Sequence, residues 1–208
     1  AHFWTAMSYV HEGKTDDAIA EIRKMSAIDE AGKDLVALSG TYANMANILL
    51  EAGRVDEAEA RFREQVAAID RSDVAPQVKA ATHRQRIFDE ARVALARNDV
   101  PAARAKSAAY AQAISALKIP FEVRQGHELA GRIALAEKNY TAAAAELRQA
   151  NQQDPRVLYL LATALQGKGD AAGAKTAAVQ AADWNALSNT YGYVRGKARA
   201  MATTSKKN

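Results

Sequence analysis

Apolar residues recur every three or four positions along most of the chain, and no long stretch alternates between apolar and polar residues. Such spacing collects apolar side chains on one face of an α-helix, whereas strict alternation would favour a strand. The pattern therefore predicts an all-α protein. We expect eleven helices, at residues 2–12, 16–31, 34–52, 55–70, 75–97, 100–117, 121–137, 141–152, 156–167, 171–182 and 186–201.

A short sequence motif, in which a turn residue is followed by an apolar helix with an early alanine, occurs five times. The copies begin at Glu12, Ala52, Arg97, Glu137 and Lys168. Gly and Asn tolerate the positive φ common at helix ends. We expect this conformation at Gly13, Gly53, Asn98 and Gly169. Short polar side chains cap helix starts, and we expect such caps at Thr15, Asp99, Thr141, Asp170 and, before Pro155, at Asp154.

The expected helices also carry matching packing positions. In the second helix of a pair, Ala18 and Ile22 lie one turn apart, and the spacing recurs in the later copies. The first helix of each pair has a small residue where the two helices would cross: Ala6, Ala46, Ala91, Gly131 and Ala162. This self-similarity predicts a stack of antiparallel helix pairs.

The chain resembles the tetratricopeptide repeat (TPR) family, most closely in its fourth copy, through Ala130, Gly131, Tyr140, Ala143, Leu147, Ala150 and Pro155. The equivalent turn residues are separated by 40, 45, 40 and 31 positions, against about 34 in a standard repeat. The chain is therefore similar to bacterial TPR-like proteins with irregular repeat lengths.

This resemblance implies a right-handed α-α superhelix (a TPR-like solenoid) of about five helix pairs with a C-terminal capping helix. The repeat domain would cover residues 1–201, with repeats near 1–32, 33–71, 75–118, 121–154 and 155–184 and the capping helix at 186–201. Residues 202–208 would form a disordered tail. Because Phe3, Trp4 and Met7 are already in helical register, we expect the chain to be part of a longer protein. These three side chains would be exposed and would favour self-association.

Composition narrows the classes of chemistry. The 208 residues include no cysteine, which excludes disulfides, zinc fingers and thiol catalysis. The compartment stays open, since a soluble protein of this composition could be cytoplasmic, periplasmic or exported. No apolar run approaches the roughly 20 residues that span a bilayer, so we expect no membrane insertion.

Charge is spread unevenly, with an excess of acidic residues in 1–104 and of basic residues in 105–208. A basic end would suit an acidic partner or a nucleic acid, or it could be an ordinary solvated helix end. With only four Phe and two Trp, few side chains could stack on bases, so we expect no nucleic-acid partner.

Catalytic and cofactor patterns are not found in the sequence. The four histidines lack metal-ligand spacing, and the glycines at 167 and 169 belong to a repeat turn and form no phosphate loop. Acidic pairs such as Asp16 and Asp17 fall at helix N-termini, where they complement the helix dipole. We therefore expect no catalytic residue, no metal, no cofactor and no enzymatic activity.

In the TPR arrangement, the first helices of the pairs line a concave groove. Carrying the groove positions onto this chain gives Asn44, Asn47, Gln85, Arg92, Gln125, Arg132 and Tyr159. Amides can hold the main chain of an extended peptide, and two arginines can hold a carboxylate. We expect Arg92 and Arg132 to point into a cleft; the alternative is that they pair with Asp89 and Glu128.

The resemblance thus implies a protein- or peptide-binding scaffold that uses this groove. Two alternatives remain open: a regulatory or sensor segment that binds another part of its own chain, and a structural oligomerisation module.

Overall fold

Helices account for every element in residues 1–185 and 189–204, the part of the chain that the computed structural model describes. All eleven expected helices are present, and their ends differ from the expected ones by at most three residues. No strand occurs in these ranges. The all-α prediction is confirmed, and successive helices within residues 1–97, and within residues 98–204, pack against one another in the manner of a TPR-like helical repeat.

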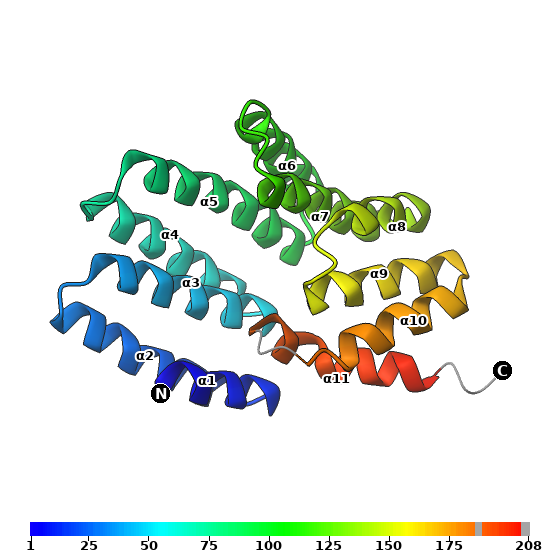
Figure 1. The fold of residues 1–208 in the computed structure, drawn as a ribbon, viewed down its shortest axis with the longest axis horizontal. Coiled ribbons are helices and arrows are strands. Elements are labelled where there is room, and N and C mark those ends of the chain that lie inside the picture. Colours follow the sequence, from blue (N-terminus) through cyan, green and yellow to red (C-terminus); the bar gives the residue numbers. More distant parts are fainter. Residues whose placement is uncertain (186–188, 205–208) are drawn as a thin grey trace. The chain divides into compact units, whose positions relative to one another are not determined.

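The chain divides into two compact units, Ala1–Arg97 and Asn98–Asn208 (Figure 1). The first unit contains α1 (His2–His11), α2 (Thr15–Ala31), α3 (Leu35–Glu51), α4 (Val55–Arg71) and α5 (Pro76–Ala96). The second contains α6 (Val100–Ile114), α7 (Pro120–Ala136), α8 (Tyr140–Gln149), α9 (Pro155–Lys168), α10 (Ala171–Ala182) and α11 (Asn189–Thr204). The single repeat domain over residues 1–201 stays a prediction; its third expected pair, 75–118, has one helix in each unit.

Left-handed residues separate the two helices of each pair, as predicted. Gly13, Gly53 and Gly169 have φ values of 74°, 78° and 89°, and Asn98 has a φ of 58°. At the equivalent position before α8, Lys138 adopts a φ of 60°. In every copy, the residue that follows is the N-cap of the next helix.

Three predicted caps are confirmed, and two are wrong. The side chains of Asp99, Asp154 and Asp170 accept hydrogen bonds from backbone N–H groups of α6, α9 and α10. Thr15 and Thr141 instead lie inside the first turn of their helices, because the caps directly follow the left-handed residues, at Lys14 and Asn139.

The predicted crossing positions are buried. Ala6, Ala46, Ala91 and Ala162 are fully inaccessible. At Gly131, an added Cβ would lie 2.6 Å from Cγ of Leu147, which is shorter than any ordinary carbon contact. The glycine is therefore required for the close approach of α7 and α8.

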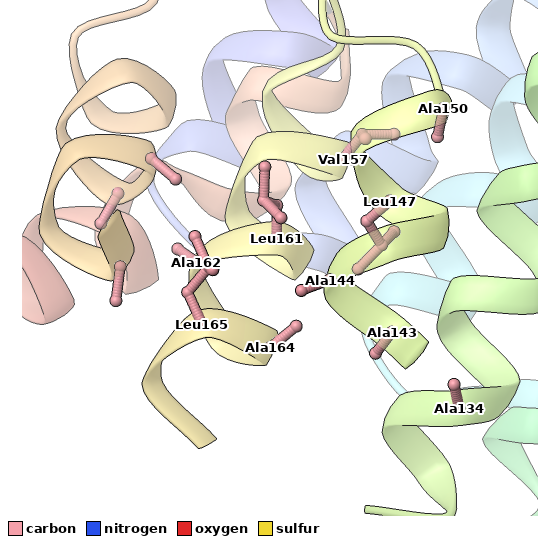
Figure 2. Close-up of a cluster of buried hydrophobic side chains, with 13 residues drawn as sticks. Ala134, Ala143, Ala144, Leu147, Ala150, Val157, Leu161, Ala162, Ala164 and Leu165 are labelled. Carbon is pink, nitrogen blue, oxygen red and sulfur yellow. The ribbon is translucent and has the colours of Figure 1, made fainter. Parts of the chain in front are cut away.

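The core of the second unit is built largely from alanine and leucine. One cluster joins Ala134 of α7 to side chains of α8, α9 and α10 (Figure 2). The side chains of α8, including Ala144 and Leu147, lie between those of α7 and α9 in this view. Small side chains let the helices approach closely, which explains how a chain with few aromatic residues forms a dense core.

The last helix, α11, packs against α9 and α10. Its Ala198 joins Leu158, Ala181 and Ala182 in a second buried cluster. Residues 202–204 continue the helix, although the sequence analysis placed them in a disordered tail, because Met201 and Ala202 pack against the main core cluster. The expected start of this helix at 186–188 and the tail residues 205–208 lie outside the described residues.

The N-terminal helix exposes fewer apolar side chains than expected. Trp4 is 49% exposed, and its ring lies edge-on to that of Phe3 with centroids 5.0 Å apart. Met7, which was also expected to be exposed, is buried. Met7 follows the fully buried Ala6 and so lies on the side of α1 that packs against α2.

Candidate functional site

The seven candidate residues all lie on first helices of the expected pairs. Asn44 and Asn47 are on α3, Gln85 and Arg92 on α5, Gln125 and Arg132 on α7, and Tyr159 on α9. The helices α3 and α5 belong to the first unit, and α7 and α9 belong to the second. The candidates therefore form two sets, and each set has its own geometry.

In the first set, Arg92 connects α5 to α3. Its Nη1 donates hydrogen bonds to Oδ1 of Asp89, at 3.0 Å, and to Oδ1 of Asn47, at 2.8 Å. Its Nη2 lies 3.6 Å from a carboxylate oxygen of Glu51 on α3. The side chains of Arg92 and Asp89 are almost fully buried, so each charge depends on these partners to offset its lost hydration.

The amides of this set are held to different degrees. Nδ2 of Asn47 donates to the backbone oxygen of Ala43 at 2.8 Å, so both ends of this carboxamide have partners. Nε2 of Gln85 lies 3.3 Å from Oδ2 of Asp89. Asn44 is partly buried, and no hydrogen bond joins its side chain to another residue in the described part of the chain.

In the second set, Glu128 is the central group. Nε of Arg132 donates to Oε1 of Glu128 at 2.8 Å, and Nη2 of Arg156, on α9, lies 3.6 Å from the same oxygen. Gln125 accepts a 2.7 Å hydrogen bond from the hydroxyl of Tyr110 on α6. Tyr159 is partly buried and packs against the cluster around Leu158.

The expectation that Arg92 and Arg132 avoid Asp89 and Glu128 is therefore wrong. Each acid precedes its arginine by three or four residues, which places both on the same helix face. Burial favours pairing, because an isolated guanidinium in a dehydrated site is costly. The two arginines act first as structural residues.

The cavities lie elsewhere. One, of about 380 Å³, lies between α2 and α4 over α3, and Tyr42, Met45 and Leu49 form part of its lining. Another, of about 470 Å³, lies between α6 and α8 over α7, and its lining includes Ala130 and Ala134. None of the seven candidate residues lines either cavity.

The two cavities occupy the same place in their repeats. Met45 and Ala130 each lie eight residues before the left-handed residue of their pair, and Leu49 and Ala134 each lie four before it. The sequence analysis did not single these positions out, because its candidates came only from the groove positions that the TPR resemblance implies. The sequence does contain a signal for them, because the first helices of both pairs repeat an apolar or small residue eight and four positions before the left-handed residue.

Two arginines, the partly buried Arg54 and the exposed Arg97, link helices of the first unit. Arg54 joins α4 to Asp16 of α2 at 2.6 Å, and Arg97, after α5, bonds Asp56 and Glu59 of α4 at 2.6 and 2.8 Å. The hydrogen bond from Arg97 lowers the pKa of the Glu59 carboxyl below its usual range. These acids at helix N-termini thus bind arginines, which accounts for them without an acid–base reaction.

Two further observations concern ligands and membranes. Within residues 1–185 and 189–204, no group of three or more His, Asp or Glu side chains could hold a metal ion. Among the helices in these ranges, none is both long and apolar enough to cross a membrane.

Comparison with known families identifies the repeat. A family model described as "Tetratricopeptide repeat" matches residues 40–64, which run from α3 across the turn at Gly53 into α4. This match supports a TPR assignment. The segment contains Ala46, Ala58 and Phe62, the buried crossing positions of the α3–α4 pair. No curated protein matches the chain significantly.

A TPR repeat is typical of protein-interaction scaffolds, and helical repeats of this kind are typically non-catalytic. The family and the all-helical architecture therefore agree with the interaction role that the sequence predicts.

Proposed function

We propose that this protein binds a partner polypeptide through the first-helix faces of its TPR-like repeats. The seven candidate residues divide into two roles in this proposal. Asn44, Gln85, Gln125 and Tyr159 contact the partner, whereas Arg92, Arg132 and Asn47 hold the first helices in place. The arginines are thus positioning residues in this proposal, and they do not act as a clamp for a carboxylate.

The observation that carries the proposal is the contrast between Asn44 and Asn47. They are three residues apart on α3, which makes them neighbours on one helix face. Arg92 and Ala43 hold the Asn47 carboxamide. The partly buried carboxamide of Asn44 has no partner among the described residues, so it can donate to and accept from the main chain of an extended peptide.

Site-specific photo-crosslinking tests this proposal. A photoreactive amino acid is placed at Asn44 or Tyr159, and matched controls carry it at the exposed Arg63 and Thr176 on second helices. We expect one and the same polypeptide to be captured from an extract of the source cells at 44 and 159, and not at the two controls. Equal capture at all four positions would contradict the proposed face.

The alternatives give different products. Links only between two copies of this chain would indicate an oligomerisation module. Links only to other parts of the full-length chain would indicate an intramolecular regulatory segment. Once a partner is captured, Asn44→Ala should weaken its binding about fivefold, the value of one ordinary hydrogen bond, without changing the melting temperature. Gln180→Ala, on α10, is the matched amide control and should bind normally.

A further inference from the structure

A patch of large apolar side chains lies exposed where α6 joins α7. Leu117, Ile119, Phe121 and Val123 are 45%, 39%, 51% and 40% exposed. They belong to the connection at residues 115–119 and to the first turn of α7, at one end of this helix pair (Figure 1). We call these four residues the connection patch.

Two cations lie beside the connection patch. Lys118 is part of the connection and Arg124 directly follows Val123, whereas Arg104 pairs with Glu137 at the other end of α7. Lys118 and Arg124 are exposed, and the nearby Glu122 is buried. The solvent-facing charge beside the patch is therefore positive, and it complements an anionic surface.

One of the two equivalent connections in the first unit, that between α2 and α3, lacks this combination. Between α2 and α3, Ile28 and Val36 are 59% and 49% exposed, so apolar side chains are exposed there too. Three acids, Asp29, Glu30 and Asp34, accompany Lys33 at this connection. It therefore serves as a comparison within the same chain: similar apolar exposure, opposite charge.

The shape of the connection patch favours a lipid surface over a folded protein. None of its four residues lines either of the two cavities described above. The neighbouring exposed positions of α6 are mostly alanines, such as Ala105, Ala109 and Ala113, which give a shallow surface. A membrane interface has no fixed shape, and it accepts apolar side chains that project between cations.

We propose that the connection patch attaches this protein peripherally to a membrane surface rich in anionic lipid. Leu117, Ile119 and Phe121 enter the headgroup region, and Lys118 and Arg124 contact the lipid phosphates. This contact differs from crossing the bilayer. It uses residues other than those proposed above for polypeptide binding, although both proposals place residues on α7.

Co-sedimentation of the full chain with vesicles tests the proposal. The vesicles are pure phosphatidylcholine, or equal parts phosphatidylcholine and phosphatidylserine. We expect binding to the mixed vesicles that weakens as salt is added, because salt screens exposed charges. Lys118→Gln and Arg124→Gln should each weaken it about fivefold. Phe121→Ser should weaken it about tenfold through lost apolar burial.

The matched control is the double variant Ile28→Ser, Val36→Ser, which should bind the mixed vesicles like the unaltered chain. Circular dichroism verifies that every variant keeps its helices. Absence of binding to the mixed vesicles, or an equal loss in the control, overturns the proposal. So does Phe121-dependent binding to polyglutamate without binding to vesicles, a result that would assign the connection patch to an acidic protein.

Discussion

In the first unit a buried cation lies between two acids, and in the second unit a buried acid lies between two cations. Arg92 pairs with Asp89 on its own helix and approaches Glu51 on α3. Glu128 pairs with Arg132 on its own helix and approaches Arg156 on α9. Arg92 and Arg132 each lie six residues before the left-handed residue of their pair, so Arg92, the central group of one network, is equivalent to Arg132, an outer group of the other.

The inversion shows what this repeat requires at its first-helix face. In each unit a charged group on one first helix reaches another first helix, and a group of either sign can take the central place. The ion pair of the first unit is the more deeply buried of the two. The side chains of Arg92 and Asp89 are 4% and 3% exposed, against 17% and 6% for Arg132 and Glu128. Equivalent residues should therefore differ in their contribution to stability.

The largest expected effect is that of Arg92→Ala. This variant leaves Asp89 buried without its main cation, which costs about 3–5 kcal/mol for a broken buried pair. Arg132→Ala leaves Arg156 near Glu128 and should cost only about 1–2 kcal/mol. Urea unfolding followed by circular dichroism measures both free energies, with the exposed Arg63→Ala as control. Equal losses from the two variants would mean that the difference in burial has no energetic consequence.

Part of this site could be predicted from the sequence. The spacing of Asp89 and Arg92, and of Glu128 and Arg132, made pairing along one helix a stated alternative, and that alternative is correct. The partners Asn47 and Glu51 could not be predicted, because they lie more than forty residues from Arg92. Such contacts depend on how far α3 and α5 slide past each other, which irregular repeat lengths leave undetermined.

The fold was more predictable than the site. Helical periodicity and the left-handed turn residues are local signals, and they placed all eleven helices. The division into two compact units has no such local signal, since the turn motif between α5 and α6 is the same as in the other pairs. Met7 was misassigned because a missing upstream neighbour was assumed to expose it, whereas α2 covers that face of α1.

The helix crossings extend the comparison to packing. Seven residues before the left-handed residue, the α3–α4 pair has Ala46, whereas the α7–α8 pair has Gly131. Nine residues after it, the partner is Phe62 in one pair and Leu147 in the other, and both side chains are fully buried. The two helix pairs thus cross at equivalent sequence positions, but different side chains occupy these positions.

Gly131→Leu is the second prediction in size. A side chain at 131 meets Cγ, Cδ2 and the backbone nitrogen of Leu147, so the two helices must separate. Overpacking of this kind costs about 1–3 kcal/mol. The companion change Ala46→Gly removes one methyl group and should cost about 1 kcal/mol, mainly through helix propensity. If thermal unfolding gave Gly131→Leu the stability of the unaltered chain, the crossing at Gly131 would not be as close as described.

The smallest effects concern the left-handed turns, where Gly53 and Lys138 occupy equivalent positions with φ values of 78° and 60°. Gly53→Ala should destabilise by about 1 kcal/mol, because a Cβ is unfavourable in this region, although nothing lies within 4 Å of it. Lys138→Gly relieves the same strain but makes the unfolded chain more flexible, so its net effect should stay within about 0.5 kcal/mol. Parallel urea titrations compare the two variants. A stabilised Gly53→Ala variant would show that this turn is not held in the left-handed region. The α3–α4 and α7–α8 pairs would then be equivalent in their helices but not in their turns.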